Sequence, residues 1–352
     1  MSNQSKRIYR VSLVTALALA IAYALRIDLP FIAPLFTFLL ALRSEQPINL
    51  KSLLVLMVVI AITLSCGLLL ITMLQHYPFT GLMLAALGIY KSAQLIGSKD
   101  KVLVGIFFMM GITMLSSVGT LSFVFALTMM NAIMMGVFIA VVCQWLVFPW
   151  FAISPSQEKP TPAEAESENS PNKQASSYNI ALQTTAIVFP VYLLALTNPA
   201  LYLPLILKSV LLGQQTSNTD IQKFGDELLL STLAGGVLAI ALWGVLQIQP
   251  NLWIFFLLTL LSSLYVCRKM FTEGASQFTP SFWQNALVTM FILVGPAVQD
   301  TLVGNDPFRA FAVRMSLYIA LSIYAWFAAY FIERFRLQRQ QSNSIATDGA
   351  AS

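Results

Sequence analysis

Charged residues are scarce in this chain, and their scarcity excludes a water-soluble globular protein. Only 10% of the 352 residues are charged, whereas 57% are hydrophobic. The longest stretch without Asp, Glu, Lys or Arg covers residues 102–157. Because a membrane-spanning helix needs roughly 20 apolar residues, this stretch has room for two spans and a turn. The composition therefore predicts an all-α integral membrane protein.

Histidine and cysteine are also rare, and neither type forms a cluster. His76 is the only histidine and falls in a short turn, and Cys66, Cys143 and Cys267 all fall in apolar segments. A disulfide framework or a metal cluster is therefore not expected. The chain has no G-x-x-x-x-G-K-[ST] loop for ATP. With no clustered His, Asp, Ser or Cys on facing helices, the sequence predicts neither an enzyme nor a cofactor.

Apolar segments recur along the whole chain and predict about twelve transmembrane helices. The expected spans in the first half are residues 11–25, 29–42, 53–74, 79–96, 102–115 and 123–151. Those in the second half are residues 180–197, 200–212, 228–246, 252–267, 282–298 and 310–332.

One polar stretch separates the two sets of spans. Residues 154–177 are rich in Pro, Glu, Ser and Lys and cannot bury enough apolar area to fold alone, so we expect a flexible cytoplasmic linker. The domain organisation that follows is a first membrane repeat at 1–153, this linker, a second membrane repeat at 178–339 and a disordered cytoplasmic tail at 340–352.

The distribution of basic residues predicts the orientation in the membrane, because Lys and Arg are retained on the cytoplasmic side. With twelve spans, all of the 20 Lys and Arg residues except Arg26, Arg309 and Arg314 fall on one side. This predicts a multi-pass protein of the bacterial cell inner membrane with both termini in the cytoplasm. The net charge of +5 then reflects topology, and no nucleic-acid partner is expected.

The two sets of spans resemble copies of each other, because marker residues recur at an offset of about 170 positions. Pro34 corresponds to Pro204, and Gly67 in Ser-Cys-Gly corresponds to Gly236 in Ala-Gly-Gly. Six spans in each copy predict two parallel six-helix repeats.

The first two spans resemble those of a known family. Arg10, the Ala/Leu-rich run at 15–20 and the sequence Leu-Pro-Phe-Ile-Ala-Pro-Leu at 29–35 are similar to the opening of each membrane half in the fusaric acid resistance and aromatic acid exporter superfamily. The glycine-bearing third span fits the same pattern. Two features depart from it: Ile32 stands where an aromatic residue is usual, and the large soluble cytoplasmic domain is missing. The resemblance implies a reduced branch that exports organic acids or drug-like compounds, alongside a periplasmic adaptor protein.

Two short spans at corresponding positions carry prolines, an arrangement that marks the substrate site in many transporters. The spans are residues 29–42 and 200–212, and the candidates for a helix break are Pro34 and Pro204. An internal proline removes a backbone hydrogen bond, which favours a broken helix. Proline is equally well tolerated at a helix start, so a plain helix start is the alternative.

Lys208 is a single cation inside an apolar span, and Phe38 stands at the corresponding position of the first half. An ammonium that faces the bundle interior would attract a carboxylate substrate. The alternative is that Lys208 snorkels to the cytoplasmic headgroups, because the polar residues Gln214 and Gln215 follow within two turns.

Four further polar residues are candidates for a substrate pathway. Arg314 lies near the start of the last span, where it would contact substrate or form a structural ion pair with Asp300 or Asp306 of the preceding loop. The other three are amides inside spans, and interhelical hydrogen bonds explain them equally well. They are Asn131, Gln183 and Gln284.

Two functions fit these observations. The first is an efflux transporter that exports small organic compounds, such as aromatic or other carboxylic acids or drug-like molecules, from the inner membrane. The second is a non-transporting or channel-like membrane subunit that anchors a periplasmic adaptor, which fits the absence of a central Asp or Glu from every span. The partners to be expected are the lipid bilayer, a small-molecule substrate, a periplasmic adaptor protein and further copies of the same chain.

Overall fold

The computed structural model describes most of the chain as helix. The described residues are 3–43, 46, 48–98, 101–151, 171–213, 221–272, 274, 276–303 and 307–348, and all regular secondary structure among them is helical. Nine helices in this part of the chain are long and apolar enough to cross a membrane, and three shorter apolar helices accompany them.

The first half of the molecule runs from α1 to η3. Its helices are α1 (Asn3–Ala24), α2 (Ile32–Arg43), α3 (Leu50–His76), α4 (Pro78–Ile96), α5 (Val102–Met110), the π-helix η2 (Gly111–Leu115), α6 (Ser116–Leu121), α7 (Phe123–Val147) and the 3-10 turn η3 (Phe148–Trp150). The segments α5, η2 and α6 follow one another without a break and form one rod, the η2 rod, over residues 102–121.

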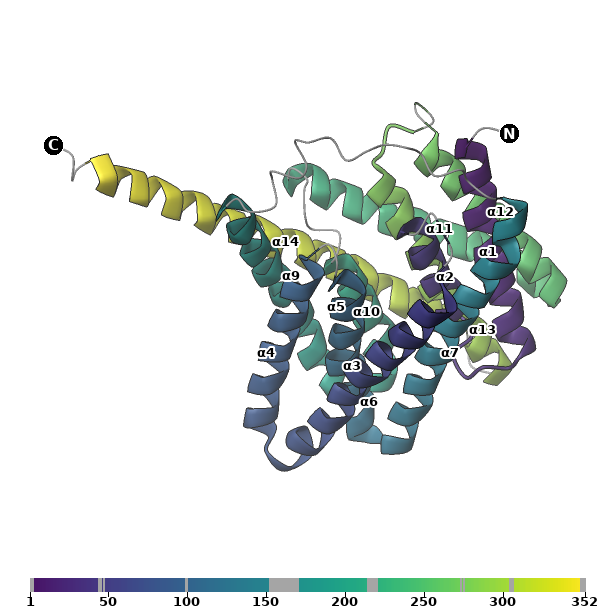
Figure 1. The fold of residues 1–352 in the computed structure, drawn as a ribbon, viewed down its shortest axis with the longest axis horizontal. Helices are drawn as coiled ribbons and strands as arrows, with labels where there is room; N and C mark the ends of the chain where they lie inside the picture. Colours follow the sequence, from purple (N-terminus) through teal and green to yellow (C-terminus); the bar gives the residue numbers. More distant parts are fainter. Residues whose placement is uncertain are drawn as a thin grey trace.

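The second half contains α9 (Pro171–Thr197), α10 (Pro199–Gly213), α11 (Ile221–Ile248), α12 (Leu252–Phe271), α13 (Pro280–Val303) and α14 (Pro307–Asp348). Figure 1 shows that α14, in yellow, continues past the bundle toward the C-terminus. Residues 340–348 are therefore helical, and the prediction of a disordered tail is wrong for them. The predicted linker lies largely outside the described residues, but its last seven positions, from Pro171, already belong to α9.

Helix boundaries follow from local capping chemistry. Ser122 precedes α7 and its hydroxyl accepts a hydrogen bond from the Phe125 N–H. Asn251 precedes α12 in the same way and accepts from the Trp253 N–H. Pro78 begins α4, where a missing N–H costs nothing. These signals explain why the spans predicted from hydropathy begin close to the observed helices.

Two rods form the centre of the molecule. In the apolar 18-residue stretch of the η2 rod, and in that of the Pro280–Gln299 part of α13, 78% of the residues are buried, against 28–50% in the other long helices. The short helices α2 and α10 are also enclosed, since residues 32–41 and 203–212 are all buried. The remaining helices surround this centre and turn apolar side chains outward, as lipid-facing helices do.

The two halves use the same helix pairs. In the first half α1 packs on α2, α2 on α7 and α3 on the η2 rod; in the second half α9 packs on α10, α10 on α14 and α11 on α13. By their order in each half, α9 is the counterpart of α1 and α12 is the counterpart of α4. The contacts between the halves are reciprocal in this sense, because α1 packs on α12 and α9 packs on α4. Figure 1 shows α1 and α12 side by side although they are far apart in the sequence.

Glycines allow the closest helix crossings. A Cβ atom on Gly67 of α3 would overlap the carbonyl group of Gly111 in η2, so only glycine fits at this crossing. In the second half, Gly235 of α11 meets the carbonyl oxygen of Ala286 on α13 in the same way. Gly236, which the sequence paired with Gly67, instead faces Met315 of α14. Gly235, rather than Gly236, therefore makes the contact that resembles that of Gly67.

A tyrosine of α14 compensates for a proline inside α9. Pro190 has no N–H and leaves the Ala186 carbonyl, four residues earlier, without its helical partner. The Tyr324 hydroxyl donates to this carbonyl oxygen at 2.7 Å. This bond ties α14 to α9.

Tyr324→Phe should therefore weaken the contact between α14 and α9. We expect a loss of about 1 kcal/mol, the usual size of an interhelical hydrogen bond in membrane proteins. The thermal unfolding midpoint in detergent measures it. The matched control is Tyr330→Phe on the same helix, since Tyr330 is exposed and has no hydrogen bond among the described residues. Equal midpoints for the two variants would contradict the assigned role of Tyr324.

Candidate functional site

Lys208 lies at the centre of a buried polar cluster that joins three helices of the second half. Its side chain projects from α10 and is only 1% exposed. The ammonium donates to Thr232 Oγ1 on α11 at 2.9 Å. It also lies over the ring of Tyr318 on α14, with 4.8 Å between Nζ and the ring centroid. Ser322, one turn after Tyr318, places its Oγ 3.1 Å from Thr232 Oγ1. We call these four residues the Lys208 cluster.

The hydroxyls of the cluster are oriented by their own helices. Thr232 Oγ1 donates to the Leu228 carbonyl at 2.8 Å, and Ser322 Oγ donates to the Tyr318 carbonyl at 2.8 Å. A hydroxyl has one donor and two acceptor lone pairs, so these bonds leave the lone pairs of Thr232 for the ammonium. The cluster therefore presents acceptors to Lys208 without placing a negative charge beside it.

The charge of Lys208 is not neutralised by the part of the chain that the structure describes. No described carboxylate lies within ion-pair distance of Nζ, and Thr232 is its only hydrogen-bond acceptor there. An ammonium has three donors, so two of them have no described acceptor. Because Nζ is enclosed by protein, the alternative in which Lys208 snorkels to the headgroups is wrong. The arrangement suits an incoming anion.

A row of polar pairs leads along α11 toward the Lys208 cluster. Near the start of α11, Glu227 accepts a 2.5 Å hydrogen bond from Thr279 Oγ1. One turn further, Asn285 Nδ2 of α13 donates to Ser231 Oγ at 2.7 Å. Thr232 is the next residue. The polar groups between α11 and α13 thus extend along α11 as far as Ser231, which is adjacent in sequence to Thr232 of the Lys208 cluster.

The other residues expected to line a pathway lie outside the Lys208 cluster. None of them forms a described hydrogen bond with Lys208, Thr232 or Ser322. Asn131 is exposed on the outer side of α7, while Gln183 of α9 and Gln284 of α13 are half-buried. Arg314 is half-buried one turn before Tyr318 on α14 and has an interaction of its own. The expected ion pair with Asp300 or Asp306 involves side chains outside the described part of the structure.

The prolines do not break their helices. Pro34 lies in the first turn of α2, which begins at Ile32, so the helix-start alternative describes it. Pro204 lies inside α10, but the helix continues without interruption from Pro199 to Gly213. Neither α2 nor α10 is discontinuous, and the site is formed by side chains rather than by unwound backbone.

Several members of the site carry no individual signal in the sequence. Thr232, Ser322 and Asn285 are single polar residues in apolar helices, and such residues are common wherever helices hydrogen-bond in membranes. Only the packing of α10, α11, α13 and α14 places Thr232 and Ser322 beside Lys208 and Asn285 against Ser231.

These observations define an all-α, multi-pass membrane protein with a charged residue buried among its helices. Residues 7–147 match the family described as "Protein of unknown function (DUF2955)". No curated protein and no solved structure matches the chain. The family match does not extend to the fusaric acid resistance and aromatic acid exporter superfamily, so that resemblance stays a prediction.

Proposed function

We propose that this protein exports small organic carboxylates across the bacterial inner membrane and that the Lys208 cluster binds the carboxylate. The observation that carries this proposal is the buried ammonium of Lys208 without a described counter-charge. A charge inside a membrane protein is costly, and such residues usually belong to a substrate or ion pathway.

We also propose that the protein consists of two parallel six-helix repeats, and the pairing of the helices supports this architecture. Equivalent helices pack on one another in both halves, and the contacts between halves are exchanged in the way that a two-fold axis would relate them. The family match ends at residue 147, which is also the end of α7 and of the first set of apolar helices. This agreement favours the interpretation that the first half is one structural repeat.

The cluster has the chemistry to select a carboxylate. Two donors of the Lys208 ammonium remain for the substrate, whereas the hydroxyl of Ser322 already donates to the Tyr318 carbonyl. Burial of a lone ion is unfavourable, but a hydrogen-bonded pair of opposite charges recovers much of that cost. The ring of Tyr318 would lie against the apolar part of the substrate. A neutral analogue would leave the ammonium unpaired and should bind more weakly.

The test is the accumulation of radiolabelled aromatic and aliphatic carboxylates in cells that lack the protein and are complemented with variants. Wild type should lower accumulation. Lys208→Met should abolish this effect at equal membrane levels, because it removes the charge and keeps the volume. The matched control is Lys91→Met, since Lys91 is exposed on α4 and donates to Gln94 Oε1. It should behave like wild type.

Two results would contradict the proposal. If Lys208→Met exports as well as wild type, the cluster does not bind the substrate. If wild type itself changes no accumulation but copurifies with a periplasmic adaptor, the protein is a non-transporting or channel-like subunit that anchors that partner.

A further inference from the structure

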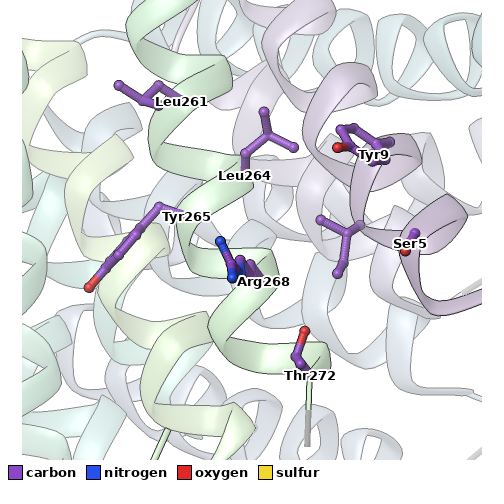
Figure 2. A pocket seen from close by; sticks show the side chains of 8 residues that line it. Ser5, Tyr9, Leu261, Leu264, Tyr265, Arg268 and Thr272 are labelled. Atoms are coloured by element: carbon purple, nitrogen blue, oxygen red, sulfur yellow. The ribbon is translucent and has the colours of Figure 1, made fainter. Parts of the chain in front are cut away.

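A groove between α1 and α12 combines an apolar floor with an arginine at its end. Its volume is about 470 Å³, and it is lined by Ser5, Ile8, Tyr9, Leu261, Leu264, Tyr265, Arg268 and Thr272. Figure 2 shows Tyr9 and Ser5 on one side and the α12 residues on the other, with Arg268 beyond Leu264 and Tyr265 toward Thr272. The groove is therefore amphipathic along its length. We call it the α1–α12 groove.

The apolar part of the groove is open to the surroundings of the protein and has fixed aromatic sides. Leu261 is 65% exposed, so the floor faces the membrane. Tyr9 stacks on Phe151 with ring centroids 6.2 Å apart, and Tyr265 meets Trp283 edge-on at 5.8 Å. These contacts hold the two tyrosines in place beside the leucines. The shape and polarity suit a hydrocarbon chain.

The polar end of the groove is positively charged and has no acidic residue on either of its helices. Neither α1 nor α12 contains Asp or Glu. The guanidinium of Arg268 has no hydrogen bond or ion pair within the described part of the chain. Nearby on the same helix ends, Arg7 lies over the ring of Phe271 at 4.6 Å, and Lys269 follows Arg268. Among the described residues, the charge of Arg268 therefore remains available for an anion.

We propose that the α1–α12 groove is a binding site for an anionic phospholipid. The phosphate contacts Arg268, and one acyl chain lies along Ile8, Leu261 and Leu264. Planar guanidinium groups suit phosphate oxygens, and basic pockets between helices at the cytoplasmic surface recognise anionic headgroups. The orientation predicted from the basic residues places this end of α1 and α12 at that surface.

A second groove on the same protein lacks an arginine without a described partner, and it serves as the comparison for lipid binding. It has a volume of about 400 Å³ and lies between α3, α4 and the η2 rod, lined by Cys66, Leu69, Leu70, Met73, Leu84, Leu87, Gly88, Lys91, Phe108 and Ile112. Its single charged residue, Lys91, already donates to Gln94 Oε1 at 3.3 Å. This groove should hold an acyl chain without preference for the headgroup.

The experiment is native mass spectrometry of the full chain in neutral detergent, with dioleoyl phosphatidylglycerol or dioleoyl phosphatidylcholine added. Wild type should retain the anionic lipid in preference to the zwitterionic one. Arg268→Gln should lower this preference roughly fivefold, because one basic residue near the headgroups contributes about that factor. Arg268→Lys and the comparison variant Lys91→Gln should keep the preference.

The acyl chain is tested separately. Leu261→Gln should weaken retention of both lipids, and inorganic phosphate at millimolar concentration should not displace the anionic lipid. An unchanged preference in Arg268→Gln would overturn the proposal. Displacement by phosphate together with an unaffected Leu261→Gln would also overturn it, because the groove would then be a simple anion site. These outcomes are independent of substrate export, since Lys208 lies on other helices.

Discussion

Gly67→Ala is expected to destabilise the protein by about 3 kcal/mol, although it adds only one methyl group. The new Cβ would overlap the carbonyl group of Gly111, and these are backbone atoms that cannot turn aside as a flexible side chain does. Helix α3 would have to move away from the η2 rod, which is one of the two most enclosed rods of the molecule. The thermal unfolding midpoint in detergent and the yield of monodisperse protein measure the loss.

The matched control is Gly244→Ala on α11. Gly244 is also a glycine within an apolar helix, but nothing lies within 4 Å of the position that its Cβ would take. Since alanine favours a helix by up to about 1 kcal/mol over glycine, this variant should be as stable as wild type or slightly more so. A similar loss in both variants would show that the α3–η2 crossing is not the cause.

Thr232→Val is expected to cost about 3 kcal/mol, because it removes the only described hydrogen-bond acceptor of a buried ammonium and leaves that donor unsatisfied. The cost should disappear when Lys208→Met is added to the same chain. Lys208→Met alone should be neutral or stabilising, as replacement of a buried ion by an apolar residue of similar volume often is. Unfolding midpoints of the two single variants and the double variant form a complete cycle.

The first half provides the control for this cycle. Thr63 of α3 is also buried, but its hydroxyl bonds only to the Val59 and Ile60 carbonyls of its own helix, each at 2.9 Å. Thr63→Val should therefore change stability by less than about 1 kcal/mol. If Lys208→Met fails to rescue Thr232→Val, the threonine stabilises the helices for a reason other than the ammonium.

Hydropathy predicted the helices well because the bilayer requires long apolar segments wherever the chain crosses it. Every expected span overlaps a described helix, and α10 and α12 begin at or within one residue of the expected position. The short helix α2 was less well placed. Its span was expected from residue 29, but the chain between α1 and α2 stays irregular through Phe31, and the helix begins at Ile32.

The details of packing were not accessible from the sequence. Gly235 and Gly236 are adjacent and identical, and only the rotation of α11 about its axis decides that Gly235 meets α13 while Gly236 meets α14. The same holds for Lys208, whose distance from the end of α10 allowed both a buried and a headgroup position. The π-helix at Gly111–Leu115 contains no proline or other evident sequence signal. It lies where α3 packs on the η2 rod, and this contact is a feature of the packing that the sequence does not reveal.

The short buried helices α2 and α10 differ in charge at one buried position. On the alignment that pairs Pro34 with Pro204, Phe38 of α2 corresponds to Lys208 of α10, and both side chains are fully enclosed. A transporter assembled from two equivalent halves would offer two charged sites. The described pair α2 and α10 offers one, so on the proposed function each turnover carries a single anion, and the dependence of flux on substrate concentration should be hyperbolic rather than sigmoidal.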